Sequence, residues 1–420
     1  TARCRTRYRS HTPCCRSSAT VTAGRAMPTH PAAGGETFGV VWRQGVADHN
    51  QPMHLTSFGP ACAGLSITLL ALACSEAHCA KPGKKKPAVV RSDTAPDVVT
   101  YGRRDDVVAF ARQAAEVRGL DADWAAAQLA QARYQPSVAK LVMPPPAGVA
   151  KNWEAYRARF VEPQRIREGL RWWQANEVAL ARAEARWGVP ADIVAAIVGV
   201  ETFYGRILGN YKVIDALATL AFDFPSGRSD RSSFYRDELG AFLQWSSNEG
   251  RDPQSVKGSY AGAIGLPQFM PSSILKYAID FDDDGRIDLD THGADVVGSV
   301  AHYFAQFGWQ RDLPTHYPVA PPSELRDRAL LLAPDILPSF SPAQFTEHGA
   351  VLDEAGLAHS GPLALVELHN GDNAPTYVAG TRNFYVVTRY NWSSYYAMAV
   401  IELARAMRQM RPPPPMPATE

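Results

Sequence analysis

The sequence predicts an α+β fold that is mainly α, a helical body with a small strand-containing insert. Apolar residues recur at helical spacing through most of residues 104–313 and again after Asn383. Short apolar runs typical of strands are confined to the proline-rich residues 314–380. All six cysteines lie before residue 80, so disulfides cannot hold the rest of the chain together. An apolar core must therefore stabilise the body, and a segment of this length can supply one.

Composition and charge exclude several classes of protein. The chain has 420 residues, of which 46% are hydrophobic, and a formal net charge of +1. Residues 1–86 carry 11 Lys and Arg against 3 Asp and Glu, and the remainder carries 32 against 39. A body with net negative charge is poorly suited to phosphate binding, so we expect no nucleic-acid partner. The absence of cysteine after Cys79 excludes a cysteine nucleophile and a cysteine zinc site in the body.

Residues 1–80 are interpreted as a leader and signal region outside the fold. Residues 59–74 contain no charged residue, but a bilayer span needs about 20 apolar residues, so this stretch is short for one. It suits the apolar part of a signal peptide, and Ala73-Cys74 resembles a lipoprotein cleavage and acylation site. A buried core helix is the alternative interpretation. Residues 81–103, which begin with lysine and proline, are expected to form a linker.

Two further segments are expected to be helical, and the chain is expected to end in a disordered tail. Residues 104–188 form the predicted N-terminal helical part, and residues 381–410 form the predicted C-terminal segment. The proline-rich residues 411–420 are the predicted tail. The apolar residues at helical spacing are Val107, Val108, Ala111, Ala115, Trp153, Phe160, Ile166, Leu170, Trp173, Val178 and Trp187, then Tyr395, Met398, Ala399, Leu403 and Met407.

The segment 190–206 holds the most informative residue. Pro190 and Asp192 are typical of a helix start, and the next eight residues are apolar or glycine, which predicts a helix buried nearly all round. Glu201 follows on the same face as three aliphatic residues, Val194, Ile197 and Val198. A carboxyl group buried there needs a raised pKa or a partner. It is either a general acid or a structural partner of a cation such as Arg206.

Five blocks in order resemble the membrane-bound lytic murein transglycosylase B family. They are VETFYGR (200–206), DALATLA (215–221), GSYAGAIGLPQFMPSS (258–273), DFDDDGRI (280–287) and NFYVVTRYNWSSYYAMAV (383–400). The resemblance covers about residues 104–410. It implies a lysozyme-like helical catalytic core in residues 189–313, with additional helices and a small β-containing insert in residues 314–380.

The resemblance also implies an activity. Family members cleave the β-1,4 bond between N-acetylmuramic acid and N-acetylglucosamine in peptidoglycan without water, leaving a 1,6-anhydromuramoyl product. One glutamate acts as acid and then as base, and Glu201 occupies its position. Asp215 and Asp223 are other acids nearby, so a second catalytic carboxylate stays open. A hydrolytic muramidase, a non-catalytic glycan-binding or scaffolding protein and a calcium-dependent structural protein are the alternatives.

The same resemblance implies a set of glycan-facing residues. The residues are Ser259, Gln268, Phe269, Arg231, Tyr390, Asn391 and Tyr396. By composition alone the two tyrosines would be placed at the edge of the core. The small residues Gly262, Ala263 and Gly265 would let the backbone approach a sugar, or they serve tight packing.

Residues 280–288 reproduce the first nine positions of a calcium-binding EF-hand loop. Acids stand at positions one, three, five and nine, and glycine stands at position six. Position twelve, where the standard loop has a glutamate ligand, is Thr291. The resemblance implies that a later aspartate completes the site instead, and Asp295 is the candidate. The expected ligands are Asp280, Asp282, Asp284, the backbone carbonyl of Arg286, Asp288 and Asp295. A solvated acidic turn is the alternative.

The expected calcium is structural, and no organic cofactor is expected. The expected partners are peptidoglycan glycan strands and the cell-wall synthesis machinery. Export to the periplasm is expected, with a lipid anchor to the outer membrane left open.

Overall fold

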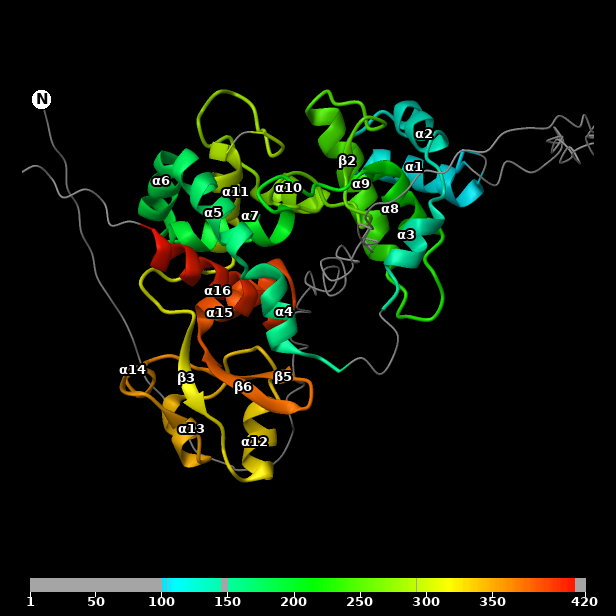
Figure 1. Cartoon of the computed structure of the whole chain (residues 1–420). Helices are drawn as coiled ribbons and strands as arrows, with labels where there is room; N and C mark the ends of the chain where they lie inside the picture. Colours follow the sequence, from blue (N-terminus) through cyan, green and yellow to red (C-terminus); the bar gives the residue numbers. More distant parts are fainter. Residues whose placement is uncertain (1–99, 103, 145–149, 292, 412–420) are drawn as a thin grey trace, which may run out of the picture. The chain divides into compact units, whose positions relative to one another are not determined.

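The computed structural model describes residues 100–102, 104–144, 150–291 and 293–411. Within those ranges the chain forms sixteen α-helices and six short strands, which confirms the mainly α prediction (Figure 1). The leader and signal region, most of the expected linker and nearly all of the expected tail lie outside the described residues. In the described part, no helix has both the length and the apolar character needed to cross a bilayer.

Six helices precede the segment that carries Glu201. The side chains of Asp121, Asn152 and Glu162 accept backbone N–H groups at the starts of three of them and so define where these helices begin. Gly188 ends the sixth helix in a left-handed conformation. The helices are α1 (Asp105–Arg118), α2 (Ala122–Ala130), α3 (Pro136–Leu141), α4 (Trp153–Phe160), α5 (Pro163–Ala175) and α6 (Glu177–Trp187).

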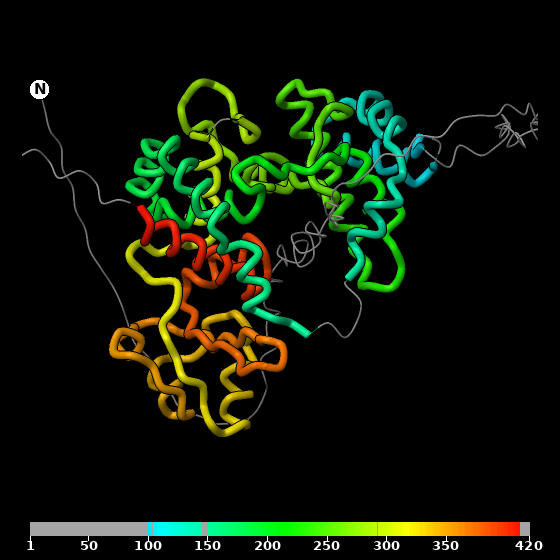
Figure 2. The backbone as a smooth tube through the Cα atoms, viewed as in Figure 1, coloured from blue at the N-terminus to red at the C-terminus, as the bar shows by residue number. Residues whose placement is uncertain are grey.

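The helix α7 (Ala191–Thr202) is buried along its whole length, as its apolar sequence predicts. The C-terminal helix α16 (Ser394–Met410) packs against it and also contacts α4 and α5. Figure 2 shows the red C-terminal segment beside the green helices. Arg408 of α16 also pairs with the buried Asp192 of α7, with 2.5 Å between Nη2 and Oδ2. The end of the chain therefore covers the helix that carries Glu201.

Four further helices and a two-stranded sheet follow α7. They are α8 (Val213–Phe222), α9 (Ser232–Asn248), α10 (Pro271–Tyr277) and α11 (Gly293–Gln306), with β1 (Tyr211–Lys212) antiparallel to β2 (Lys257–Gly258). Helix α9 packs against both α8 and α10. Buried side chains from all four helices join the apolar cluster that also includes α7 and α16. The loops between these helices therefore rest on one common core.

The insert consists of a four-stranded antiparallel sheet and three short helices. The strand order is β4 (Val351–Leu352), β3 (His316–Ala320), β6 (Asn373–Gly380) and β5 (Ala364–Asn370). The helices are α12 (Leu325–Leu332), α13 (Pro342–Glu347) and α14 (Glu354–Leu357). Tyr317, Phe345 and Leu365 belong to a smaller apolar cluster of the insert, distinct from the main one. Helix α15 (Arg382–Tyr390) then leads back to α16.

Three residues depart from the sequence-based expectations. Tyr101, expected in the linker, is buried, and its hydroxyl donates to Asp223. Arg411, expected to begin the disordered tail, lies over the ring of Trp173, 4.7 Å from its centroid. Val178, expected on the apolar face of its helix, is 83% exposed. Contacts with aromatic rings thus extend the folded part of the chain beyond both expected boundaries. The area that these rings bury stabilises the adjoining segments.

Candidate active site

Glu201 lies in the last turn of α7, with its carboxyl group inside the protein. The residue is 9% exposed, and the neighbouring residues of the helix are buried. Its Oε1 accepts a hydrogen bond from the hydroxyl of Tyr396 on α16. Its Oε2 has no hydrogen-bond partner among the described residues. One oxygen of a buried carboxyl group is thus left for a partner that the protein does not supply.

The environment keeps this carboxyl group protonated. Burial raises the pKa of Glu201 from the usual 4.5 to about 8, and the hydrogen bond from Tyr396 offsets part of that shift. Glu201 is therefore mostly neutral at pH 7. A neutral carboxylic acid with a free oxygen is what a general acid for glycosidic cleavage requires.

The structure does not support the alternative that Glu201 is an ion-pair partner of Arg206. The Nη2 of Arg206 lies 2.8 Å from Oε1 of Glu168, so this guanidinium is paired elsewhere. Across the described ranges, no lysine, arginine or histidine forms an ion pair with Glu201. The carboxyl group is stabilised by losing its charge and not by a neighbouring cation.

Four tyrosines from four helices lie near enough to Glu201 for its charge to act on them. Burial raises the pKa of each, and a negative charge on Glu201 would raise it further. They are Tyr156 of α4, Tyr303 of α11, Tyr390 of α15 and Tyr396 of α16. The site is therefore assembled from elements that are far apart in the sequence.

The three predicted residues of the C-terminal segment are buried, and Tyr396 and Tyr390 lie close to Glu201. Tyr396 is fully buried, and its hydroxyl is committed to Glu201. The hydroxyl of Tyr390 donates to the backbone oxygen of Pro267 at 2.6 Å, and its ring stacks on that of Tyr396 with 6.5 Å between centroids. Asn391 is 2% exposed. This segment therefore orders the carboxyl group and the loop at Pro267.

The loop between β2 and α10 carries three more predicted site residues. Ser259 accepts the backbone N–H of Ala263 on its Oγ at 3.0 Å and so shapes the loop. Gln268 has a positive φ of 51°, and its Nε2 donates to the backbone oxygen of Gly265 at 2.8 Å. Phe269 is 2% exposed. A non-glycine residue held at positive φ is common at binding sites, where the surrounding structure maintains the strain.

The glycines of this loop serve tight packing, which was one of the two interpretations left open. A Cβ at Gly262 would lie 2.4 Å from the side chain of Leu217, and one at Gly265 would lie 2.6 Å from the backbone oxygen of Leu289. Both glycines have positive φ. Ala263 is fully buried. A side chain at either glycine would collide with protein atoms, so the close packing of this loop requires them.

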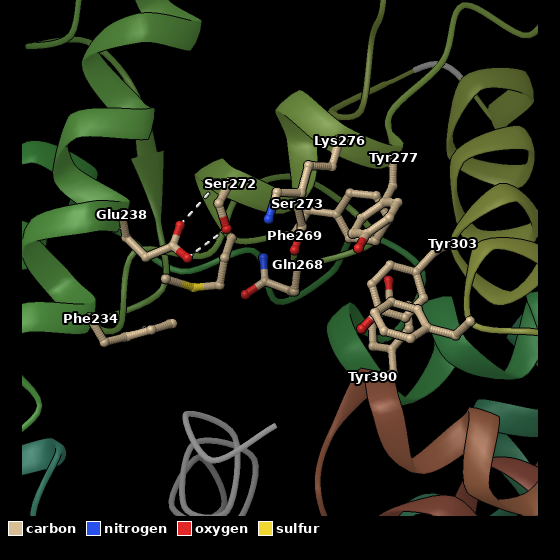
Figure 3. Close-up of a pocket in the computed structure, with 12 residues that line it drawn as sticks. Phe234, Glu238, Gln268, Phe269, Ser272, Ser273, Lys276, Tyr277, Tyr303 and Tyr390 are labelled. Atoms are coloured by element: carbon tan, nitrogen blue, oxygen red, sulfur yellow. Dashed lines mark hydrogen bonds between the residues drawn. The ribbon is translucent and has the colours of Figure 1, made fainter. Parts of the chain in front are cut away.

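A pocket opens beside this loop, and aromatic and polar side chains line it (Figure 3). In the view of Figure 3, Gln268 lies between Phe234 and Glu238 on one side and Tyr303 and Tyr390 on the other. The full lining is Phe234, Glu238, Gln268, Phe269, Met270, Ser272, Ser273, Lys276, Tyr277, Tyr303, Phe307 and Tyr390. The pocket adjoins the candidate acid, because the ring of Tyr390 stacks on that of Tyr396, whose hydroxyl donates to Glu201. Flat aromatic rings with a few amide, hydroxyl and amine groups suit a sugar ligand.

Sequence reasoning missed three residues of this region. Tyr156 and Tyr303 lie on amphipathic helices, where an aromatic residue normally signals only a core position. Glu238 is buried on α9, and its carboxyl group accepts both the Oγ–H and the backbone N–H of Ser272, at 2.6 and 2.9 Å. Burial raises the pKa of Glu238. Nothing in the sequence distinguishes these residues from others on the same helices.

The other two acids considered for catalysis, Asp215 and Asp223, both accept hydrogen bonds from other residues. Asp215 accepts the backbone N–H of Arg133 and the Nε2 of Gln135. Asp223 accepts two hydrogen bonds from one guanidinium nitrogen of Arg104. Both carboxylates are thus used to hold the N-terminal helices against α8.

Arg231 precedes α9, and its guanidinium lies 4.6 Å from the centroid of the Phe234 ring. Because Phe234 lines the pocket, Arg231 is placed near the pocket's edge. Burial lowers the pKa of Arg231, and the nearby cation Arg228 adds to that effect. A half-buried guanidinium of this kind favours an anionic partner.

The acidic loop brings three of its predicted ligands together. Asp280, Asp282 and Asp284 each offer a carboxylate oxygen, and these oxygens lie within 4.8 Å of one another. Hard cations such as Ca²⁺ prefer clustered carboxylate oxygens, so these residues fit the expected ion. Gly285 makes the turn at a φ of 87°. Arg286, expected to contribute its carbonyl, follows directly.

The other two acids connect the loop to itself and to α11. Asp295 is 1% exposed and accepts the backbone N–H groups of Phe281 and Asp288, at 2.7 and 2.8 Å. Asp288 in turn accepts the backbone N–H groups of Asp290 and Thr291. Asp295 therefore closes the two ends of the loop onto the helix through hydrogen bonds.

Comparison with known proteins agrees with this fold. Membrane-bound lytic murein transglycosylase B of Escherichia coli K12 is 37% identical over 298 residues, which are 67% of this chain and 77% of that protein. The structure of the Escherichia coli lytic transglycosylase Slt35 in complex with calcium shares 34% identity, with a TM-score of 0.62, over 73% of this chain and 94% of that one. The structure of SltB3 from Pseudomonas aeruginosa in complex with NAG-anhNAM-pentapeptide shares 28% identity, with a TM-score of 0.58, over 71% and 78%.

The mainly helical fold and the buried acid beside a pocket, together with these similarities, define a lysozyme-like enzyme of the lytic transglycosylase class. Its activity is that of a lytic murein transglycosylase. The transglycosylase SLT domain matches residues 102–405, which is more than half of the chain. The chain therefore belongs to the transglycosylase SLT domain family.

Proposed function

We propose that the enzyme cleaves the β-1,4 bond between N-acetylmuramic acid and N-acetylglucosamine in peptidoglycan without consuming water. Glu201 first donates its proton to the bridging oxygen as the bond from C1 of the muramoyl residue to that oxygen breaks. The resulting carboxylate then takes the proton of the muramoyl C6 hydroxyl as that oxygen bonds to C1. The product is a 1,6-anhydromuramoyl end, and Glu201 returns to its protonated form.

One observation carries this proposal: the buried Glu201 carboxyl group is neutral at pH 7 and keeps Oε2 unpartnered. A hydrolase normally needs a second carboxylate as nucleophile or base. The nearby acids Asp215 and Asp223 are already held by Arg133, Gln135 and Arg104. A reaction in which the substrate supplies its own nucleophile needs one acid/base group.

The neighbouring residues have proposed roles in binding and positioning. Tyr396 orients the Glu201 carboxyl group through its hydroxyl. Tyr390 and Gln268 line the pocket and present a ring and an amide to a sugar and its acetamido group. Arg231 faces a carboxylate of the lactyl group or stem peptide. Ser259 and Phe269 maintain the loop between β2 and α10, and the buried Asn391 maintains the packing of the C-terminal segment.

Calcium is proposed as a structural ion of the acidic loop. Asp280, Asp282 and Asp284 would hold it, with the carbonyl of Arg286, Asp288 and Asp295 as the further ligands expected from the sequence. The ion would neutralise the crowded carboxylates and keep the loop folded. The calcium complex of Slt35 supports this assignment. The ion takes no part in the acid/base step.

The enzyme is proposed to work on glycan strands in the periplasm. The signal-like residues 59–74 and the membrane-bound character of the Escherichia coli relative support export, with Cys74 as the site of an outer-membrane lipid anchor. The complex of SltB3 with NAG-anhNAM-pentapeptide supports a peptidoglycan fragment as ligand and an anhydro sugar as product. The cell-wall synthesis machinery is the proposed protein partner.

Mass spectrometry of digested peptidoglycan sacculi tests the reaction. Wild type should release anhydromuropeptides, and Glu201→Gln should release none, with a matched Glu249→Gln variant of an exposed helix-end acid behaving as wild type. Products heavier by one water would show a hydrolytic muramidase instead. Equal inactivity of wild type and Glu201→Gln, with sacculus binding retained, would show a non-catalytic binding protein.

A further inference from the structure

Arg165 is a buried cation that forms no ion pair among the described residues, although the charge of Glu162 acts on it and favours its charged form. It lies in the first turn of α5 and is 7% exposed. Its Nη1 donates to the backbone oxygen of Gly199 at 2.6 Å, and its Nε has no hydrogen-bond partner in the part of the chain that the structure describes. Burial lowers the pKa of Arg165. Burial of an unpaired charge is unfavourable, so a well-packed apolar residue would serve stability as well or better.

Two contacts of the guanidinium lie at the end of the helix that carries Glu201, and a third is with Phe160 of α4. The Cζ atom lies 4.5 Å from the ring centroid of Phe203 and 5.2 Å from that of Phe160. Gly199 precedes Glu201 by two residues, and Phe203 follows it by two. Arg165 therefore holds the chain on both sides of the acid, through a hydrogen bond on one side and a cation–π contact on the other.

The chain after Glu201 is in a conformation that needs support. Phe203 and Tyr204 have φ values of 51° and 57°, and Gly205 has 86°. Left-handed backbone costs a non-glycine residue roughly 1–2 kcal/mol, so two such residues in succession persist only where their surroundings hold them. The turn also ends α7, because the N–H groups of Phe203 and Tyr204 donate to the oxygens of Gly199 and Val198.

Each strained residue has its own restraint. The hydroxyl of Tyr204 fits a slot formed by two glycines, since a Cβ at Gly169 or Gly199 would lie 2.3 or 2.4 Å from it. The ring of Phe203 has no such slot and is only half-buried. Two guanidinium groups flank this ring, the buried Arg165 and the half-exposed Arg206, whose Cζ is 5.5 Å from the centroid.

We propose that Arg165 is a positioning residue for the acid/base step. Its guanidinium fixes the end of α7 and thereby keeps the Glu201 carboxyl group against Tyr396. The inference rests on the proposed function, because it assigns Arg165 a role in the reaction of Glu201. Without the guanidinium, the ring of Phe203 is free to leave its left-handed position, and the last turn of α7 can unwind. The carboxyl group then gains access to water and loses its fixed direction.

The substitution Arg165→Met tests this role because it keeps the volume and removes the charge and the hydrogen bond. We expect kcat for release of anhydromuropeptides to fall at least tenfold, with KM within twofold of wild type. The melting temperature should stay the same or rise, because an unpaired buried charge is removed. Arg165→Lys should recover only part of kcat, since an ammonium can donate to Gly199 but lacks the planar stack.

The pH profile supplies a readout that a purely structural role would not change. Tyr156, Tyr303, Tyr390 and Tyr396 are the titratable groups on which the charge of Glu201 acts, and none of them is altered. If the Glu201 carboxyl group of the variant is exposed to water, its pKa should fall, and the alkaline limit of kcat should move to lower pH. Arg186→Met is the matched control, because its exposed guanidinium lies 4.6 Å from the ring centroid of Trp187 on α6, and all readouts should remain as in wild type.

A double-mutant cycle with Phe203→Leu isolates the contact itself. If both residues act through one restraint, the double variant should lose no more kcat than either single variant. A folded Arg165→Met enzyme with wild-type kcat and alkaline limit would overturn the inference, and so would additive losses in the cycle. If Arg165→Met does not fold, full kcat in Arg165→Lys overturns the inference, and a tenfold loss supports it. Failure of wild type to make any anhydro product would instead refute the proposed function.

Discussion

Two buried carboxyl groups, Glu201 on α7 and Asp295 on α11, have similar sequence surroundings and opposite hydrogen-bonding states. Each lies on a helix rich in buried aliphatic residues, and burial raises the pKa of each. Asp295 accepts two backbone N–H groups, one on each oxygen. Glu201 accepts a single hydroxyl and leaves its second oxygen unpartnered. A carboxyl group that the protein satisfies holds structure, and one that it leaves unsatisfied is available for chemistry.

The comparison extends to a third buried acid, Glu238. Its carboxyl group lines the pocket and would be a candidate for catalysis by location alone. Both of its oxygens accept hydrogen bonds from Ser272 at the start of α10 (Figure 3). By the same criterion Glu238 is a structural cap of that helix. Burial and position in a cleft therefore do not identify the acid, whereas the unpartnered oxygen does.

The largest expected effect is that of Glu201→Gln. Loss of the proton donor should lower kcat/KM about a thousandfold, within the usual range for a general acid. Between the usual pKa of 4.5 and the raised value of about 8, folded wild type binds more protons than the unfolded chain, so its stability falls as pH rises through that window. Glu201→Gln should lack this loss and be more stable than wild type at pH 8, as measured by urea unfolding at pH 5 and pH 8. If Glu201→Gln were less stable than wild type at pH 8, the contrast between Glu201 and Asp295 would not hold.

Calcium should have the next largest effect, on stability. At a free concentration about 100 times Kd, an ion that binds only the folded state adds about 2.7 kcal/mol. The melting temperature should therefore rise with calcium and fall with a chelator. Asp284→Asn should abolish most of this shift, because it removes one of the three clustered carboxylates. Asp283→Asn is the control, since Asp283 lies outside that cluster and asparagine tolerates its φ of 62°. A shift that survives Asp284→Asn would place the ion elsewhere.

Asp295→Asn should destabilise the protein, by about 1–3 kcal/mol, because its amide NH₂ would face a backbone N–H that has lost its acceptor. The free energy of unfolding in calcium-free buffer measures this effect. Glu201→Gln, examined at the same neutral pH, should show no such loss. If Glu201→Gln lost stability and Asp295→Asn did not, the distinction between the two carboxyl groups would not hold.

Tyr396→Phe should have the smallest effect, about a tenfold loss of kcat from the loss of one orienting hydrogen bond. This hydrogen bond lowers the pKa of Glu201, so its removal should move the alkaline limit of kcat to higher pH. That is the reverse of the shift expected for Arg165→Met. Tyr395→Phe is the control, because the hydroxyl of Tyr395 contacts the backbone of His369 and not Glu201. An unchanged limit in Tyr396→Phe would mean that the hydroxyl does not act on Glu201.

Local patterns predicted the elements of the fold better than they predicted the site. The apolar run before Glu201 predicted a fully buried helix, and the proline-rich run after residue 314 coincides with a small sheet. The alternating acids of residues 280–288 predicted a cluster, and three of them converge. These features depend on residues close in sequence, so spacing alone reveals them.

The surroundings of Glu201 could not be predicted in the same way. Tyr156 of α4 and Tyr303 of α11 lie near enough to the acid for its charge to act on them, and their spacing is that of ordinary core aromatics. Arg165 looks like any surface arginine in an amphipathic helix, yet it is buried against Phe203. Each of these roles is set by long-range packing, which periodicity does not encode.

The protonation state of the Glu201 carboxyl group can be measured in the folded enzyme. Infrared difference spectra of wild type minus Glu201→Gln, recorded across a pH titration, isolate the carbonyl stretch of this single carboxylic acid. Burial without an ion-pair partner among the described residues predicts a protonated carboxyl band that persists at pH 7, falls by half near pH 8 and disappears at higher pH. A band already lost by about pH 5, as for an ordinary glutamate, would contradict the account.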